Sequence, residues 1–268
     1  MKVIFESDDM GFSYGSVEAI KDASLEGIAT SSSLVVNGDA SLFACRILKT
    51  KLTKIGLGLH VNITDGIGKK SILTDEKGIY KYNFLSLFWL SLVKRRDIIL
   101  AVESDIKAQL KKAGSRGIKI DHINSERYVL MIPAFFEIAC KIARVNKIKY
   151  IRLSNEPLFR VRPFLKNLKP ILNLNIIKFL LLNFLAKINS RILRRHSLKC
   201  ADAMYGILYT NTALNMYSSV SANLLDSPAT TSATTYKTQF NSAAGTASVS
   251  CQPDNTSVSY ITLMEIAV

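Results

Sequence analysis

Lys2-Val3-Ile4-Phe5-Glu6-Ser7-Asp8-Asp9-Met10-Gly11 is the stretch from which the fold can first be inferred. Residues 2–7 alternate as a β-strand does and run directly into two adjacent carboxylates. Residues 16–27 then carry apolar side chains at helical spacing and end at a glycine, which is a helix stop signal. A strand that ends in polar residues and leads into a helix is the building unit of α/β proteins, whose chemistry lies at the carboxyl ends of the strands.

The same unit repeats along the chain. Predicted strands alternate with predicted helices, which implies parallel strands joined by right-handed crossovers and an α/β fold. Residues 64–83 are rich in Gly, Asp and Lys and predict a long loop over the strand ends, where substrate-binding loops are found. The further strands are expected at 33–36, 55–61, 119–123 and 150–153, and the further helices at 40–52, 84–93, 97–113 and 133–146.

The last part of the chain has a different composition. Eighteen of the residues 218–268 are Ser or Thr, and short alternating segments are separated by turn residues, which predicts β-strands. We therefore predict two domains, a β/α domain over 1–217 and a Ser/Thr-rich β-strand tail over 218–268. Residues 226–266 are also similar to β-rich terminal segments of phage fibre and virion proteins, and this similarity implies a virion-associated protein.

The net charge of +14 is concentrated in one region. Residues 144–200 contain fourteen basic residues and one acidic residue, so this run could meet a membrane surface, a nucleic acid or an anionic lipid-linked substrate, or form a solvated helix face. Lysines and an asparagine interrupt the leucine-rich part, 171–188, so an amphipathic helix is favoured over a membrane span. We predict membrane-surface contact through residues 160–199. We expect no nucleic acid partner, because the run has few aromatic residues.

Cysteine usage and the N-terminus bear on the compartment. The four cysteines are scattered without a Cys-x-x-Cys pair, and the first apolar run is too short for a signal peptide. A cytoplasmic protein is expected, peripheral to a membrane if the basic run makes the predicted contact.

Three strand ends carry candidate site residues. Asp8 and Asp9 would point in opposite directions in an extended strand, so they can act together only if the chain turns, which Gly11 makes easy. His60 and His122 lie in predicted strands, where a lone histidine is either a structural hydrogen-bonding group or a ligand. A plausible site for a hard divalent metal would consist of two carboxylates, a histidine and a later carboxylate or histidine. One of these carboxylates would then be available to act as a base.

These residues lie in motifs that resemble those of a known family. Asp8–Ser13 resembles Asp-Asp-Phe-Gly-Leu-Ser, Gly58–Thr64 resembles Gly-Leu-His-Leu-Asn-Leu-Thr, and His122–Ser125 resembles the start of His-Leu-Asp-Ser-His-x-His-x-His. Residues 27–38 and 150–157 fit the segments between and after them. In this order the motifs are similar to those of the YdjC-like carbohydrate deacetylases over residues 1–217.

The resemblance implies a fold, an activity and a site. The expected fold is a distorted, TIM-like β/α barrel that is incomplete here. The expected activity is a metal-dependent hydrolase that removes the N-acetyl group from an amino sugar, an oligosaccharide or a glycolipid. The implied metal ligands are Asp9, His60 and Glu126, and the implied catalytic base is Asp8. The residues expected to bind substrate are Asn37, Asn62, His122 and Arg152.

The sequence also departs from the family pattern. Glu126, Tyr128 and Leu130 stand where the family has histidines, Asn124 replaces an aspartate, and no histidine follows His196. A glutamate ligand favours Mg²⁺, with Mn²⁺ or Zn²⁺ as alternatives. The departures leave a second hypothesis open, a non-catalytic glycan-binding or virion-associated protein that keeps the fold. The sequence predicts no oligomeric state.

Overall fold

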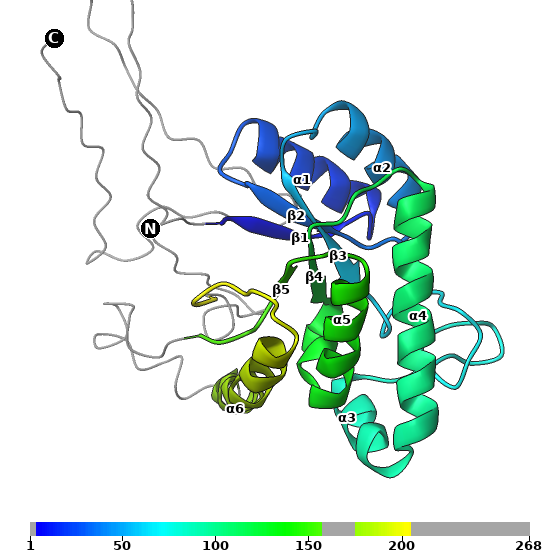
Figure 1. Cartoon of the computed structure of the whole chain (residues 1–268). Helices are drawn as coiled ribbons and strands as arrows, with labels where there is room; N and C mark the ends of the chain where they lie inside the picture. The colour runs from blue at the N-terminus through cyan, green and yellow to red at the C-terminus, as the bar shows by residue number, and fades with distance from the viewer. Residues whose placement is uncertain (1–3, 157–174, 205–268) are drawn as a thin grey trace, which may run out of the picture. The chain divides into compact units, whose positions relative to one another are not determined.

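The computed structural model describes residues 4–156 and 175–204 and shows an α/β fold built on one parallel sheet (Figure 1). The sheet has five strands in the order β1-β2-β3-β4-β5. Strands that are consecutive in the chain and adjacent in the sheet are the pattern of a β/α barrel, and five of them make part of one, as predicted. The strands are β1 (Glu6–Met10), β2 (Ser31–Leu34), β3 (Gly56–Val61), β4 (His122–Ser125) and β5 (Tyr150–Ile151).

The helices agree closely with those predicted from apolar spacing. A short helical segment, η1, was not predicted, because two residues inside it have left-handed backbone angles. The helices are α1 (Tyr14–Leu25), α2 (Ser41–Thr50), α3 (Phe84–Val93), α4 (Arg95–Ser115), η1 (Glu126–Met131), α5 (Pro133–Val145) and α6 (Asn175–Arg195). The strands predicted beyond residue 217 lie outside the described residues.

The two faces of the sheet differ in chemistry. Because side chains alternate along a strand, one face presents Leu34, Leu59 and Ile123, all fully buried in the hydrophobic core. The helices supply most of the rest of that core, and α1, α2, α4 and α5 follow one another around the sheet in Figure 1. The other face is polar and holds the candidate site. Its members include Glu6, Asp8, Ser33, His60, His122 and Asn124.

This polar face explains why three strands lie away from their predicted positions. β1 covers Glu6–Met10 where 2–7 was expected. β2 covers Ser31–Leu34 where 33–36 was expected, and β4 covers His122–Ser125 where 119–123 was expected. The prediction followed apolar residues, whereas these strands bury polar ones. Ser33, for example, donates a hydrogen bond of 2.9 Å to the carboxylate of Asp8 on the neighbouring strand.

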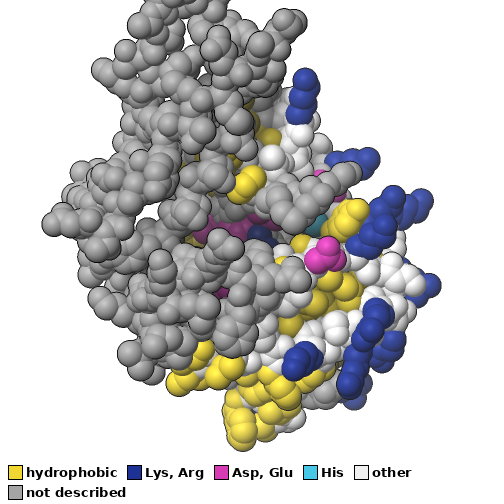
Figure 2. Space-filling view, turned by 90° about the vertical axis from the view of Figure 1, so that its left-hand side faces the viewer, with side chains coloured by type: hydrophobic (Ala, Val, Ile, Leu, Met, Phe, Trp, Pro, Cys, Tyr) yellow, Lys and Arg dark blue, Asp and Glu magenta, His cyan; other side chains and the backbone are white. Residues whose placement is uncertain are grey.

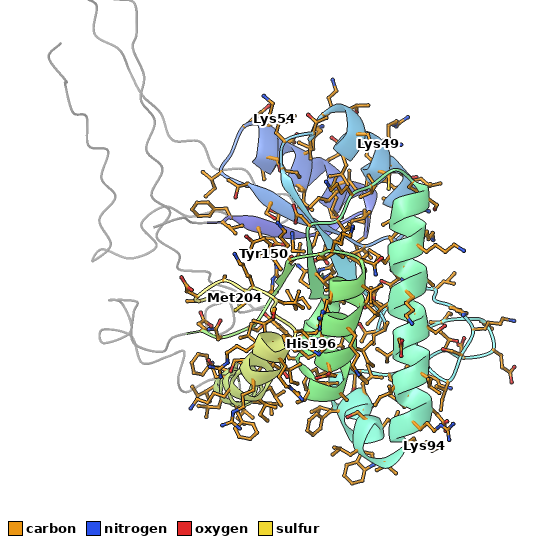
Figure 3. All side chains as sticks on the ribbon, viewed as in Figure 1. Lys49, Lys54, Lys94, Tyr150, His196 and Met204 are labelled. Atoms are coloured by element: carbon orange, nitrogen blue, oxygen red, sulfur yellow. The ribbon has the colours of Figure 1, made fainter. Side chains whose placement is uncertain are left out.

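Helix α6 packs against α5 through an ionic contact as well as through apolar side chains. His196 Nε2 lies 2.9 Å from Glu137 Oε1, and Arg195 lies 3.2 Å from the same carboxylate; Figure 3 labels His196 beside α5. Among the described residues, no helix is long and apolar enough to cross a bilayer. Figure 2 shows the side of the molecule that carries α6, with hydrophobic side chains gathered at its lower end.

Candidate metal site at the carboxyl ends of the strands

The backbone at the end of β1 lets both aspartates take part in the site. Asp9 has φ +70°, a left-handed conformation that breaks the strand alternation, and the pairing of β1 with β2 is irregular between Ser7 and Met10. Gly11 follows with φ +94°, and a Cβ there would come within 3.1 Å of the Val35 carbonyl. Ser16 of α1 fixes the turn by donating a 2.8 Å hydrogen bond to the Asp9 carbonyl. The turn inferred from Asp8, Asp9 and Gly11 is therefore present.

His60 is the centre of the site and is only 2% exposed. Its Nδ1 lies 2.8 Å from Asn124 Oδ1, and its Nε2 lies 3.1 Å from Glu126 Oε2 and 3.3 Å from Asp9 Oδ1. The Asn124 amide group faces carboxylates, so its oxygen must face the imidazole and accept the Nδ1–H. This hydrogen bond leaves Nε2 as the nitrogen that can bind a cation.

The charges of Asp9, His60 and Glu126 favour a positive charge between them. Burial alone would lower the pKa of His60, but Glu126, Asp8 and Asp9 outweigh it and raise that pKa. Burial raises the pKa of Asp9 to about 6, with help from the charges of Glu126 and Asp8 and against that of His60. Two carboxylates thus converge on one nitrogen, where a positive charge, either a proton or a metal ion, is favoured.

The donor set fits a divalent metal ion. One ligand atom from each of Asp9, His60 and Glu126 lies within 4.8 Å of the other two. Asp9 Oδ1 is buried and has no hydrogen-bond partner among the described residues, which is the state expected of a ligand oxygen. Two carboxylate oxygens and one imidazole nitrogen suit Mg²⁺, Mn²⁺ or Zn²⁺.

Glu126 reaches the site because of the unusual backbone of η1. Arg127 and Tyr128 have φ +46° and +60°, so the chain turns sharply directly after Glu126. Arg127 pairs with Asp65 at 2.5 Å and so ties this turn to the long loop after β3. The hydrogen bond from His60, against the effect of burial, lowers the pKa of Glu126 and keeps it ionised.

Asp8 is bound by Arg152 through both of its oxygens. The two N–O distances are 2.6 and 2.7 Å, and Ser33 and Asn124 each add a hydrogen bond of 2.9 Å. Burial would raise the pKa of Asp8, but Arg152 first and then His60 and Ser33 lower it to about 2. Asp8 therefore stays ionised at any working pH, with its oxygens already occupied by donors.

The expected substrate-binding residues lie in three different places. Arg152 lies beside Asp8, as described, whereas His122 lies at the amino end of β4, bonded to Asp121 and to Glu6. Asn62 caps the loop after β3: its oxygen accepts from the backbone of Thr64 and Asp65, and its amide donates to the Asp65 carbonyl.

Asn37 lies at the same loop and donates to the Asn62 carbonyl at 3.2 Å. Its buried oxygen has no partner among the described residues. The loop itself is held by Tyr80, whose hydroxyl donates to the buried Asp105 at 2.8 Å, and by Gln109, which bonds the Asn62 backbone. Asp105 and Gln109 carry no sequence signal beyond their places in a predicted helix.

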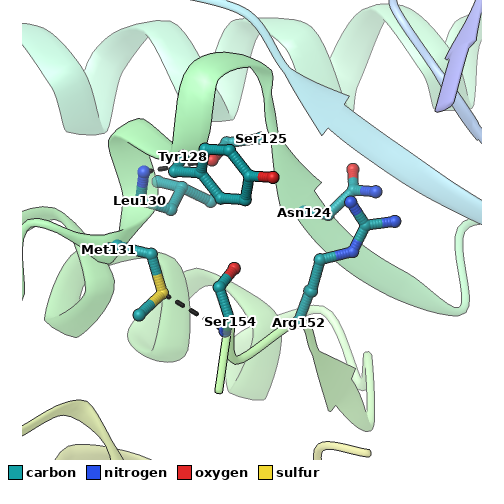
Figure 4. A pocket seen from close by; sticks show the side chains of 7 residues that line it. All are labelled: Asn124, Ser125, Tyr128, Leu130, Met131, Arg152 and Ser154. Atoms are coloured by element: carbon teal, nitrogen blue, oxygen red, sulfur yellow. Dashed lines mark hydrogen bonds between the residues drawn. The ribbon is translucent and has the colours of Figure 1, made fainter. Parts of the chain in front are cut away.

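A small pocket lies next to Arg152, where the family pattern would place histidines (Figure 4). The hydroxyl groups of Tyr128 and Ser154 point into it, whereas Leu130 contributes an apolar wall and is 3% exposed. Lys178 of α6 lies 4.5 Å from the Tyr128 ring centroid. The lining consists of Asn124, Ser125, Tyr128, Leu130, Met131, Arg152 and Ser154.

Fold and site together define an α/β protein with a histidine–carboxylate cluster at the carboxyl ends of parallel strands. The chain belongs to the family of YdjC-like proteins, whose family model matches residues 2–250. This match extends beyond the 1–217 expected from the motifs and into the Ser/Thr-rich tail, and the similarity of that tail to phage fibre proteins finds no support.

Relatives with a named activity cover part of the chain. A carbohydrate deacetylase of Brevibacillus brevis is 31% identical over 55% of this chain and 58% of its own length, and one of Vibrio cholerae is 30% identical over 54% and 56%. The chain thus spans little more than half the length of these relatives. A solved structure from Enterococcus faecalis, named for cellobiose-phosphate cleavage, has a TM-score of 0.48 and 20% identity over 62% of this chain and 63% of that one.

Proposed function

We propose that this protein is a metal-dependent carbohydrate deacetylase, acting on the N-acetyl group of an amino sugar, an oligosaccharide or a glycolipid. The observation that carries the proposal is the convergence of Asp9, His60 and Glu126, with a buried Asp9 oxygen that has no hydrogen-bond partner in the part of the chain that the structure describes. Family membership and the named activity of the relatives support the substrate class.

The chain's own residues have separable roles in this reaction. A divalent ion bound by Asp9, His60 and Glu126 would supply a Lewis acid for the acyl carbonyl and for water. Asn124 holds the Nδ1 proton of His60, so that Nε2 is presented to the ion. Two carboxylate ligands favour Mg²⁺ or Mn²⁺ over Zn²⁺.

Asp8 is the proposed base, and Arg152 sets its strength. A carboxylate with a pKa of about 2 is a weak proton acceptor, since catalysis by a base is most efficient when its pKa lies near the working pH. Asp8 can accept the proton of the attacking water only if Arg152 releases at least one of the two Asp8 carboxylate oxygens. Substrate that contacts Arg152 from the pocket of Figure 4 would have this effect.

Acetate release tests the proposal directly. Purified protein is stripped of metal, supplied with Mg²⁺, Mn²⁺ or Zn²⁺, and incubated with N-acetyl-chito-oligosaccharides. We expect turnover with Mg²⁺ or Mn²⁺ that disappears in Asp9→Asn. The absence of both acetate release and bound metal with every ion would contradict it.

The second candidate, a non-catalytic glycan-binding protein, is favoured by one observation. Leu130 is apolar and buried at a position where the family pattern has a histidine, so that position supplies no proton and no hydrogen bond to a sugar. This candidate predicts sugar binding by calorimetry without acetate release, both in the wild-type protein and in Asp9→Asn.

A further inference from the structure

The outer side of α3 is apolar. The helix packs against α4 and η1 with Leu87 and Ser91 buried, yet Leu85, Trp89 and Leu92 are 69%, 65% and 59% exposed. Their spacing of four and three residues puts them on one side of the helix. An exposed apolar surface of this kind marks a binding surface for a membrane, a ligand or another protein.

Basic residues border this apolar side. Lys94 and Arg96 follow the helix directly and are exposed, Lys81 precedes it, and Asp97 is the one acidic residue between 81 and 102. Lys94 lies at the lower end of the molecule, where α3 meets α4 (Figure 3). Leucine and tryptophan beside lysine and arginine is the composition of helices that lie in the interface of a bilayer.

Helix α6 repeats the pattern. Ile177, Leu180 and Phe184 are 62%, 58% and 61% exposed at helical spacing, and the exposed Lys187 and Arg191 continue the same side towards the C-terminal end. Both α3 and α6 pack against η1. On the side of the molecule that carries α6, the hydrophobic side chains at the lower end adjoin a row of lysine and arginine side chains (Figure 2).

We propose that α3 docks this protein on an anionic lipid bilayer. Leu85, Trp89 and Leu92 enter the boundary between headgroups and acyl chains, and Lys94 and Arg96 bind the headgroup phosphates; α6 provides a second contact of the same kind. The net charge of +14 favours a lipid surface over an apolar protein partner, because it draws the whole molecule to an anionic membrane. The basic run predicted membrane contact through residues 160–199 only. The proposal adds α3, which lies outside that run, as a second membrane-contacting helix.

The chain carries its own probe for this contact, because Trp89 is its only tryptophan. Its emission is measured with the full-length protein in buffer, with phosphatidylcholine vesicles and with phosphatidylglycerol vesicles. We expect a blue shift with phosphatidylglycerol alone, reversed by salt, and quenching when the acyl chains are brominated.

Matched variants separate the apolar and basic contributions. Leu85→Ser with Leu92→Ser should weaken vesicle binding, measured by sedimentation, by roughly 100-fold. Lys94→Gln with Arg96→Gln should weaken it by roughly 30-fold and reduce its salt dependence. Leu42→Ser, at an equally exposed leucine of α2 (69%), is the control and should change nothing. Equal thermal unfolding temperatures show that the variants fold.

Two results would overturn the proposal. One is an emission spectrum that phosphatidylglycerol vesicles leave unchanged. The other is an emission already blue-shifted in buffer, which would show that protein covers α3; loss of that shift on dilution would identify the cover as a second copy of the chain. Neither result depends on deacetylase activity.

Discussion

His60 and His122 project from neighbouring strands onto the same polar face of the sheet, and each lies among carboxylates. His122 donates through both ring nitrogens, to Asp121 and to Glu6, with Nε2 2.7 Å from the Glu6 oxygen. His60 uses Nδ1 on the neutral amide of Asn124 and turns Nε2 towards two carboxylates. The neighbours thus make one histidine a fixed cation and the other a candidate ligand.

The pKa of each ring follows from the same neighbours. Burial would lower the pKa of His122, but Asp121 and Glu6 raise it to about 9, so this ring keeps both protons at neutral pH. A doubly protonated imidazole has no lone pair for a metal. For His60, a bound ion can replace the Nε2 proton, because the amide of Asn124 binds only the other nitrogen.

The largest expected effect separates the two histidines by metal affinity. Removing a ligand in His60→Gln should lower Mn²⁺ affinity by more than about 100-fold and abolish any acetate release. His122→Gln should leave the affinity within about threefold, because it removes no ligand. Calorimetric titration of the metal-free proteins with Mn²⁺ measures both.

The reverse ranking would refute this assignment of roles. If His122→Gln lost Mn²⁺ as completely as His60→Gln while its circular dichroism stayed native, the metal would lie at the amino ends of the strands. Glu137→Gln, which removes a carboxylate on α5 beside His196, serves as the control for general charge effects.

A smaller effect on affinity is expected at Asn124, the residue that makes the two histidines different. Asn124→Ala should lower Mn²⁺ affinity by roughly 10–100-fold, because His60 loses the acceptor that fixes its tautomer. Asn124→Asp keeps that acceptor but replaces the donor to Asp8 and Glu6 by a like charge.

The two Asn124 variants therefore test different contacts. Asn124→Asp should retain more Mn²⁺ affinity than Asn124→Ala, with a free energy of unfolding reduced by about 1–3 kcal/mol. Urea unfolding with and without Mn²⁺ gives both quantities. Equal Mn²⁺ affinity in the two variants would show that the His60 tautomer is not what Asn124 controls.

Much of this arrangement could be predicted from the sequence, and the missing part has a physical cause. Helical spacing predicts α3 and α5 well, and the ordered motifs select Asp9, His60 and Glu126, whose ligand atoms the fold places within 4.8 Å of one another. Side-chain partners across strands could not be predicted, since they depend on register. The sequence marks Asn124 only as a departure from the family pattern, yet it lies opposite His60 in the β3–β4 pairing.

Register also explains a glycine that sequence reasoning used only as part of a motif. Gly58 pairs with His122, and a Cβ on Gly58 would lie 2.2 Å from His122 Nε2. Gly58→Ala should therefore reduce the free energy of unfolding by about 1–3 kcal/mol. The cost should largely vanish in a His122→Ala background, where the ring is absent. Additive losses in the double variant would place the strain elsewhere.

The last effect is the pH dependence that His122 adds to stability. Its pKa is about 9 in the folded protein and about 6.5 in an unfolded chain, so folding favours the protonated ring. The stabilisation is complete below about pH 6.5 and is lost as the pH rises to about 9. Because Asp121 is half exposed and its attraction is screened, we expect a loss of about 2 kcal/mol across this window.

Subtracting the stability of a His122 variant from that of the wild type at each pH isolates this contribution from those of other titrating groups, including His60 and Asp9. Urea unfolding at intervals between pH 6 and 9.5 should show wild-type stability falling towards that of His122→Gln, which lacks the titrating ring. Parallel curves for the two proteins would mean that folding leaves the pKa of His122 unchanged, so that its ring is neutral above about pH 7.5 in the folded state. Its Nε2 could then carry a lone pair, and the contrast with His60 would rest on position in the sheet alone.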